Sequence, residues 1–405
     1  PKDVDGKLMK NLKFGVLGLL VSVVVPAAAH AQATKPRFAV ILDTSSSMLQ
    51  TPDSAETDTH GDGSLLHPGC DPDNNGLYDD SRLFQAKAAL SDTIAAFGSA
   101  EFAFARYSSV LLGQTCTTSA SCIALTGSTS NNPSCIDVPG DGVSTKYCVQ
   151  VRDNPSSGFD YDECNGGDQG CVRCDDPAGD ATHTFERSIH CTPSSPCIHA
   201  NGCQGGNVLV GFPSSTTSNY PQIYRWIDGA EDFAANFSSA TANREIRGDA
   251  GTPLASSVDS IREWLTTPAS AVGPGAGPMS TDTKLACRTY SVIMITDGEE
   301  SCGGDPSASA RNTYHRCTNT GLWDTTDGRC EISGNATNTT EILPRIKVYV
   351  IGFATDVDAT AQLEAMAVAG GTGAAIYASN RAELTAKLGD IISSSIVTAK
   401  CDCDA

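Results

Sequence analysis

Basic residues and histidines are scarce in this 405-residue sequence. It has 27 Lys and Arg against 47 Asp and Glu, a formal net charge of −20, and only seven histidines. The shortage of basic residues argues against a nucleic-acid partner, because phosphate binding needs clustered Lys and Arg. The sequence also lacks the G-x-S-x-G, H-E-x-x-H and P-loop motifs, so we do not expect an enzyme.

Long apolar runs are also missing, apart from one near the beginning of the chain. Residues 9–31 combine two lysines, an apolar run at 14–25 and a small-x-small motif that ends at Ala31. This order is typical of a bacterial signal peptide, and the run is too short to span a bilayer as an anchor. We expect residues 1–8 to precede the natural start. We expect the mature chain to be secreted, at the cell surface or in the periplasm, without a membrane span.

Cysteine, in contrast, is abundant. The chain has 17 cysteines, ten of them at 116–203. In an oxidising compartment such cysteines are expected to form disulfides, and we expect most of these ten to pair among themselves. The alternative is a zinc site, because Cys171 and Cys174 have ligand spacing and three histidines follow. The irregular spacing beyond Cys174 and the compartment favour disulfides.

Strand and helix patterns alternate outside the cysteine-rich stretches. Apolar runs typical of buried strands lie at 38–43, 101–109, 291–296 and 346–353. Amphipathic helical patterns lie at 81–98, 252–265 and 382–396. Continuous apolar strands interleaved with helices predict an α/β fold with one open, mainly parallel, doubly wound sheet that is covered on both faces.

Two of the predicted strands end on an aspartate, at Asp43 and Asp297. The carboxyl ends of parallel strands form the usual ligand-binding edge of such a sheet. Ser45 and Ser47 follow the first aspartate, and Thr252 stands at a helix start. Each feature alone is common in turns and helix caps. Together they form a set of oxygen donors that suits Mg²⁺ or Mn²⁺.

This set resembles the metal-ion-dependent adhesion site of von Willebrand factor type A domains. The matching segments are Asp43-x-Ser45-x-Ser47, "GTPL" with Thr252, and "TDGEE" with Asp297. "KVYVIGFATD" and "LEAMAVAGGTGAAIYAS" also resemble the closing strand and helix of that family. The resemblance implies one such domain over residues 36–398. In the family, the serines and the threonine bind the ion directly or through water, and an outer position is left for an acidic group of the partner.

The resemblance therefore implies a secreted, metal-dependent adhesion or recognition module. Its partner would be a protein or surface ligand that offers an acidic group. The alternative is an extracellular structural or assembly scaffold, part of a longer polypeptide, without a metal-dependent ligand. We expect Asp43→Ala to abolish metal binding and to leave the fold intact, because the site would lie at the rim of the core.

Three insertions interrupt the predicted domain, at 50–80, 111–205 and 300–343, and a tail follows at 399–405, where we expect the chain to be truncated. The family topology places all three insertions beside the metal at the carboxyl end of the sheet. They would then shape the walls around the ion and decide which partner fits.

The first insertion contains a candidate Ca²⁺ loop. "DPDNNGLYDD" places oxygen donors at the offsets of such a loop, with the carbonyl of Leu77 as a further ligand: Asp71, Asp73, Asn75 and Asp79. Arg82 stands at the twelfth position, where Glu is usual, and Asp80 is a substitute donor. The alternative is a solvated acidic turn, because Asp, Asn and Gly are ordinary turn residues.

Overall fold

The protein is described by a computed structural model, and the described residues form one body with several small appended strands. The described residues are 34–50, 52, 81–107, 117–118, 120, 205–229, 246, 251–317 and 344–398, except 215–216, 269 and 356, together with strands between 109 and 200 and between 321 and 339. The predicted signal peptide, the calcium loop at 71–79 and the tail at 399–405 lie outside them, as do the side chains of the cysteines at 116–203. These predictions stay predictions.

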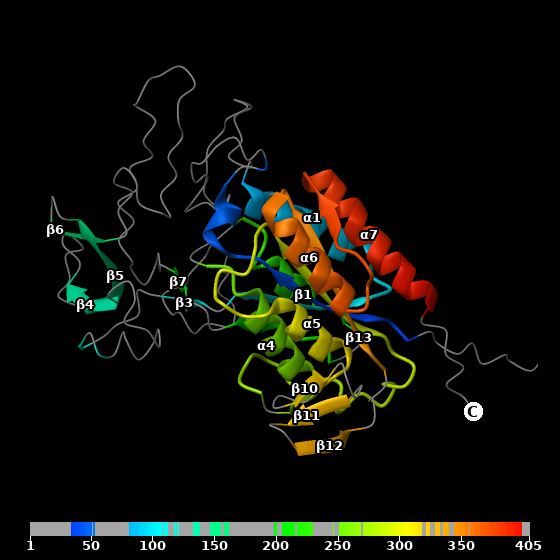
Figure 1. Ribbon diagram of the computed structural model, residues 1–405. Helices are drawn as coiled ribbons and strands as arrows, with labels where there is room; N and C mark the ends of the chain where they lie inside the picture. Colours follow the sequence, from blue (N-terminus) through cyan, green and yellow to red (C-terminus); the bar gives the residue numbers. More distant parts are fainter. Residues whose placement is uncertain are drawn as a thin grey trace, which may run out of the picture.

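A six-stranded sheet forms the centre of the body (Figure 1), in the order β14-β13-β9-β1-β2-β8. The strands are β1 (Arg37–Leu42), β2 (Glu101–Tyr107), β8 (Gly206–Val210), β9 (Tyr290–Thr296), β13 (Ile346–Phe353) and β14 (Ile376–Ala378). Neighbouring strands run parallel, except that β8 pairs antiparallel with β2 at one edge. The predicted open, mainly parallel α/β sheet is confirmed.

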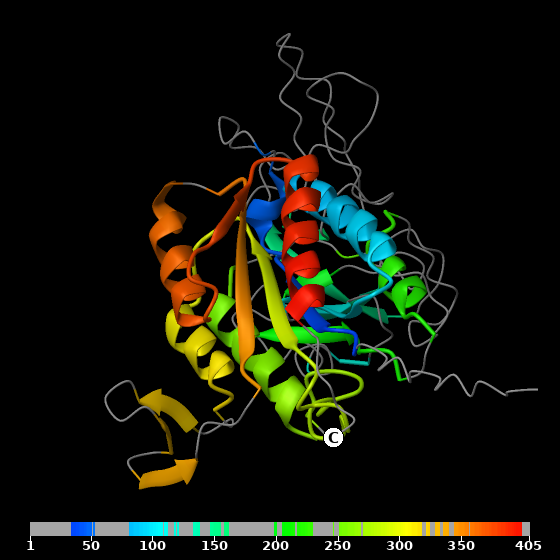
Figure 2. The ribbon, with the colours of Figure 1, turned by 90° about the vertical axis from the view of Figure 1, so that its right-hand side faces the viewer.

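Helices cover both faces of the sheet. They are α1 (Arg82–Ala96), α3 (Tyr220–Tyr224), α4 (Leu254–Thr266), α5 (Pro306–Tyr314), α6 (Val357–Ala369) and α7 (Arg381–Thr398), with a short 3₁₀ helix, η1 (Ser46–Leu49), after β1. Figure 2 shows α1 and α7 on one face and α4, α5 and α6 on the other. None of the described helices is long and apolar enough to cross a bilayer.

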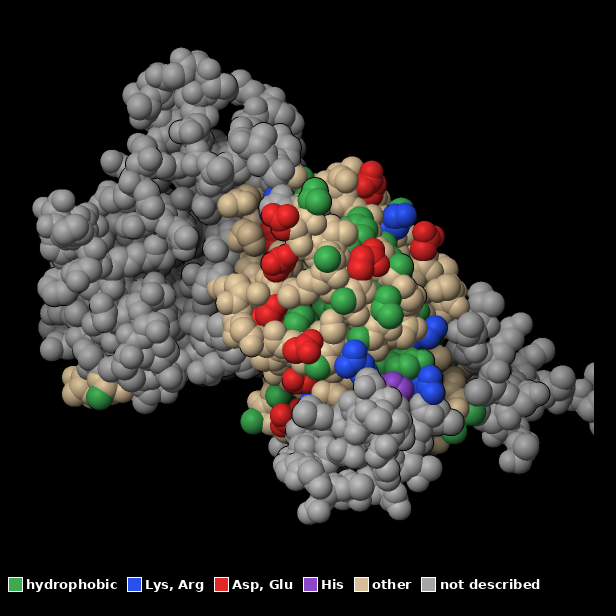
Figure 3. All heavy atoms as spheres, viewed as in Figure 1, with side chains coloured by type: hydrophobic (Ala, Val, Ile, Leu, Met, Phe, Trp, Pro, Cys, Tyr) green, Lys and Arg blue, Asp and Glu red, His purple; other side chains and the backbone are tan. Residues whose placement is uncertain are grey.

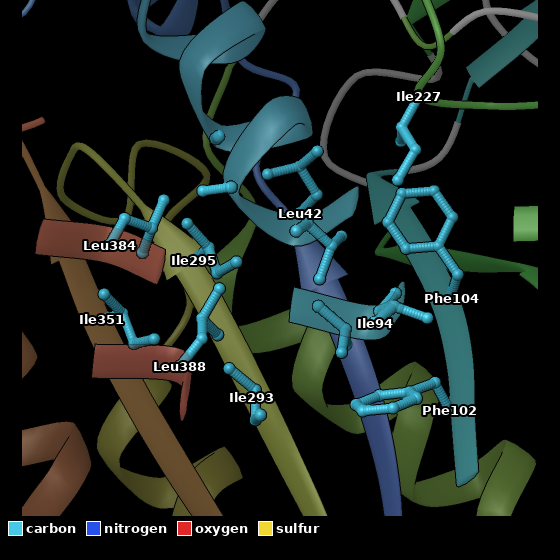
Figure 4. Packing of buried hydrophobic residues seen from close by; sticks show 14 of the residues in the cluster. Leu42, Ile94, Phe102, Phe104, Ile227, Ile293, Ile295, Ile351, Leu384 and Leu388 are labelled. Atoms are coloured by element: carbon cyan, nitrogen blue, oxygen red, sulfur yellow. The ribbon is translucent and has the colours of Figure 1, made fainter. Parts of the chain in front are cut away.

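The alternation of side chains along β1 divides the core into two layers. Phe38, Val40 and Leu42 pack in the layer with α1 and α7, whereas Ala39 and Ile41 pack in the layer with α4, α5 and α6. Successive residues of a strand point to opposite faces of the sheet, and helices cover both faces here. All residues of the strand are therefore buried, which explains its continuous apolar run. Figure 4 shows the first layer, where leucines of α7 point toward isoleucines of β9 and β13: Leu384, Leu388, Ile293, Ile295 and Ile351.

The region predicted as the third insertion contributes to the core. Helix α5 lies within residues 300–343 and packs against both α4 and α6. It leads to an antiparallel sheet of β10 (Gly321–Asp324), β11 (Arg329–Ile332) and β12 (Asn335–Thr339). Figure 1 places this sheet at the opposite end of the body from η1. The expectation that nearly all of the added mass lies around the metal is therefore wrong for these strands, because α5 carries the chain along the body and away from that end.

The second insertion contains two further small sheets. One pairs β3 (Ser109–Leu111) with β7 (Ile198–Ala200), and the other consists of β4 (Pro133–Asp137), β5 (Lys146–Asn154) and β6 (Gly158–Tyr161). All of their pairings are antiparallel. On the described surface visible in Figure 3, acidic side chains are spread over the face that α4, α5 and α6 form, with fewer basic ones among them.

Candidate metal site

The two predicted aspartates lie at the carboxyl ends of adjacent strands. β1 and β9 are parallel, with Leu42 opposite Ile295, and the backbone N–H of Asp43 donates to the Ile295 carbonyl at 2.9 Å. Asp297 follows β9 by one residue. Asp43 is fully buried and Asp297 is 3% exposed. Strand register alone therefore brings both carboxylates to one edge of the sheet.

Hydrogen bonds join these aspartates to the serine row. Asp43 Oδ1 accepts from the backbone N–H of Ser45 at 2.7 Å, and its Oδ2 accepts from the Thr296 hydroxyl at 2.5 Å. Ser47 donates to Asp297 Oδ1 at 2.8 Å, and the Ser45 and Ser47 hydroxyl oxygens are 3.0 Å apart. The chain turns into η1 directly after β1, so the row of small residues folds back over the strand ends. Four of the five predicted donors are thus one bonded cluster.

Thr252 approaches the cluster from the loop before α4. A Cβ placed on Gly298 would lie 3.9 Å from Thr252 Oγ1 and 4.0 Å from Ser47 Oγ. Both hydroxyls therefore lie beside the backbone that follows Asp297. The Thr252 side of the site is also shielded, since this residue is 7% exposed. The structure brings all five predicted residues to one place.

A clamp that the sequence did not reveal holds the Thr252 loop. The Glu300 carboxylate accepts from the backbone N–H of Ala255 at 2.6 Å and from that of Cys302 at 2.8 Å. Ser301 Oγ accepts from the Thr252 N–H at 2.6 Å, and the Ser301 N–H donates to the Thr252 carbonyl at 3.1 Å. Pro253 stands at the N-cap of α4 and supplies no capping side chain. The segment after Asp297 therefore caps α4 from a distance.

Arg82 is a further residue whose role in the site the sequence did not reveal. Its Nη1 donates to Asp297 Oδ2 at 2.7 Å, and both side chains are almost completely buried. Arg82 is the first residue of α1, whose N-cap Ser81 accepts from the Phe84 N–H. The backbone N–H of Arg82 donates to the Gln50 carbonyl at the end of η1. A residue interpreted as a mismatch in a calcium loop is thus an ion-pair partner in the candidate metal site.

Burial dominates the electrostatics of the cluster. Burial raises the pKa of Asp43 to about 7, and the charge of Asp297 adds to this rise. Burial also raises the pKa of Asp297, against the opposing effect of the Arg82 guanidinium. Burial and the nearby Asp43 charge raise the pKa of Tyr107. A cation among these groups would relieve the repulsion between the carboxylates.

The donor chemistry fits a hard divalent cation. Three hydroxyls and two carboxylates converge, and Mg²⁺ or Mn²⁺ prefer oxygen ligands and keep several waters. Among the residues that the structure describes, no group of three or more His, Cys, Asp and Glu could hold a metal. The candidate site therefore depends on hydroxyl ligands beside its two carboxylates.

The burial of Asp43 corrects one expectation. The sequence predicts that Asp43→Ala leaves the fold intact, because the site would lie at the rim of the core. Asp43 is instead fully buried, and both of its oxygens accept hydrogen bonds from Ser45 and Thr296. Removing the carboxylate leaves two buried donors unpaired, which costs about 1–3 kcal/mol for each. A loss of metal binding in this variant would be hard to separate from partial unfolding.

Comparisons with known proteins find similar structures but no related sequence. No family model matches the chain, and no curated protein matches it. BatB from Bacteroides thetaiotaomicron superposes with a TM-score of 0.34 at 11% identity, over 89% of this chain and 98% of that protein. Proximal thread matrix protein 1 from the mussel byssus, with a zinc-occupied MIDAS motif, gives a TM-score of 0.36 at 9% identity, over 90% and 46%.

A pilin gives a similar result. The PilB minor pilin from Streptococcus sanguinis superposes with a TM-score of 0.32 at 10% identity, over 91% of this chain and 63% of that protein. This chain therefore spans about half of the mussel protein and under two thirds of the pilin. At these TM-scores and identities, the description of the fold rests on the sheet order and register given above.

Proposed function

We propose that this chain is a metal-dependent recognition module that binds an acidic group of a partner. A Mg²⁺ or Mn²⁺ ion held by Asp43, Ser45, Ser47, Thr252 and Asp297 would supply the Lewis acidity that attracts such a group. The proposed role is binding rather than catalysis. We propose that the partner is a protein or a surface ligand outside the cytoplasm, since the sequence predicts export.

One observation carries the proposal: the Ser47 hydroxyl donates to Asp297 across 250 positions of the sequence at 2.8 Å. This bond joins the serine row after β1 to the carboxylate after β9. Short polar side chains at strand ends are common, but each would ordinarily satisfy a nearby backbone group. Asp43 Oδ1 does accept from the nearby Ser45 N–H, but Ser47 bonds to the side chains of Ser45 and Asp297. This bonding between side chains of two distant segments supports a ligand site more than a pair of turns.

Thr252→Ala is the sharpest variant for testing the proposal. Thr252 contributes one neutral oxygen, and its loop is held by backbone contacts to Ser301 that the substitution leaves in place. We expect Mg²⁺ affinity to fall roughly tenfold while the unfolding midpoint stays within a few degrees. Thr266→Ala is the matched control, because Thr266 lies at the far end of α4 and donates to the Arg262 carbonyl.

Isothermal titration calorimetry with Mg²⁺ would measure both variants beside the wild-type protein. Weaker binding in Thr252→Ala, with unchanged binding in Thr266→Ala, supports the proposal. A wild-type protein that binds neither Mg²⁺ nor Mn²⁺ would favour the scaffold alternative instead. Binding that is unaffected by the Thr252 change would remove this residue from the site.

A further inference from the structure

Arg82 stands out because its position is unfavourable unless it has an acidic partner. It is the first residue of α1, and the positive end of a helix dipole repels a guanidinium. Arg82 is only 3% exposed, so water cannot screen its charge. The single hydrogen-bond acceptor that the described part of the chain provides for its guanidinium is Asp297 Oδ2, at 2.7 Å, and its Nε has no partner there.

Asp297 is shared between this cation and the candidate metal site. Its Oδ2 accepts from Arg82 and its Oδ1 accepts from Ser47. A carboxylate that neutralises a buried guanidinium has less negative charge to offer an ion. Arg82 and a divalent cation therefore act on the same carboxylate from two sides.

We propose that Arg82 is a specificity-determining residue of the site: its guanidinium competes with the divalent ion for Asp297 and increases the site's affinity for an acidic group. This inference rests on the proposed function. Asp43, Asp297 and Arg82 together carry one net negative charge when both carboxylates are ionised. A divalent ion then leaves the loaded site with one net positive charge. Without Arg82 the loaded site would be neutral and would attract a carboxylate less.

The same ion pair would stabilise a form of the site that holds no divalent ion. Two buried carboxylates with no cation would destabilise the fold strongly. Arg82 supplies one positive charge from within the chain, so a folded ion-free form is accessible. Arg82 also weakens ion binding, because the ion must share Asp297 with a fixed cation.

Arg82→Gln and Arg82→Lys test the proposal together. Gln keeps a hydrogen-bond donor and removes the charge, whereas Lys keeps the charge. We expect Arg82→Gln to bind Mn²⁺ roughly tenfold more tightly than the wild-type protein, and Arg82→Lys to bind it as the wild-type protein does. Arg37→Gln is the matched control, because Arg37 pairs with Glu101 at 2.7 Å at the amino end of β1, away from the site.

Electron paramagnetic resonance would measure the concentration of free Mn²⁺ and so give its affinity. Water-proton relaxation would measure how much acetate is needed to displace a water bound to the ion. We expect acetate to act at several-fold lower concentration on wild-type protein than on Arg82→Gln. If Arg82→Gln is unstable without an ion, the rise of its melting temperature with Mn²⁺ gives the affinity by linkage.

The outcomes separate this inference from the proposed function. Equal Mn²⁺ affinity in wild-type protein and Arg82→Gln overturns the competition, although the metal site itself stands. Tighter Mn²⁺ binding with unchanged acetate binding overturns the effect on acidic groups. If neither protein binds Mn²⁺, the proposed function fails. If Arg82→Gln binds Mn²⁺ and the wild-type protein does not, both the proposed function and this inference fail, because Arg82 then takes the place of the ion.

Discussion

Glu300 links the candidate metal site to the stability of the fold, and its replacement gives a quantitative prediction. The carboxylate accepts from the Ala255 N–H in the first turn of α4 and from the Cys302 N–H in its own loop. Loss of a helix cap costs about 1 kcal/mol, and loss of a negative charge at a helix start costs a further 0.3–1 kcal/mol, roughly. With the second hydrogen bond added, Glu300→Ala should destabilise the protein by about 2–3 kcal/mol.

The same change should weaken metal binding, because the clamp positions Thr252. Glu300→Gln keeps the size of the side chain and one acceptor oxygen, so it should cost about 1 kcal/mol. Glu299→Ala is the matched control, since Glu299 is the exposed neighbour of Glu300 in the same loop. Its effect should stay within about 0.5 kcal/mol.

Urea unfolding followed by circular dichroism would give these free energies, and Mg²⁺ calorimetry would give the affinities. A Glu300→Ala protein as stable as Glu299→Ala would refute the assignment of Glu300 as the cap of α4. Full stability loss with normal Mg²⁺ affinity would instead show that the Thr252 loop does not need the clamp to hold an ion.

Two further changes probe the site and the edge of the sheet. Gly298→Ala should fold with near-normal stability, because its Cβ would lie at ordinary distances of 3.9 and 4.0 Å from Thr252 Oγ1 and Ser47 Oγ. Mg²⁺ calorimetry should nevertheless show weaker binding, since the added methyl group takes up space beside these hydroxyls. Asn219→Ala should lower the free energy of unfolding by about 2 kcal/mol, because the Asn219 amide donates to the Phe102 and Gly211 carbonyls at 2.7 Å each. Urea unfolding would measure this loss, and an unchanged unfolding midpoint would contradict the prediction.

The fold was predictable where local pattern and burial agree. The strand predictions at 291–296 and 346–353 match β9 and β13 to within one residue, because strands buried on both faces are apolar at every position. Asp43 and Asp297 were predictable for the same reason, since each interrupts such a run at its carboxyl end. Parallel register then determines that they meet.

The contacts that complete the site were not predictable, because they join distant segments. Arg82 and Asp297 are 215 positions apart, and Glu300 is 45 positions from Ala255. An arginine at the first position of a helix is unfavourable without a partner, and this was the one available signal for Arg82. Helix α5 was missed because "PSASARNTY" is short and has little apolar character, so its helical state depends on packing against α4 and α6.

The central claim is that a divalent ion binds where the serine row meets the two strand-end aspartates. Anomalous diffraction from crystals grown with Mn²⁺ tests it most directly, because the signal locates the ion without assumptions about its ligands. We expect one strong peak within coordination distance of the Ser45, Ser47 and Thr252 hydroxyl oxygens, at the carboxyl ends of β1 and β9. The contradicting result would be Mn²⁺ bound at full occupancy elsewhere and no peak between these hydroxyls. Ser47 and Arg82 would then still be bonded to Asp297.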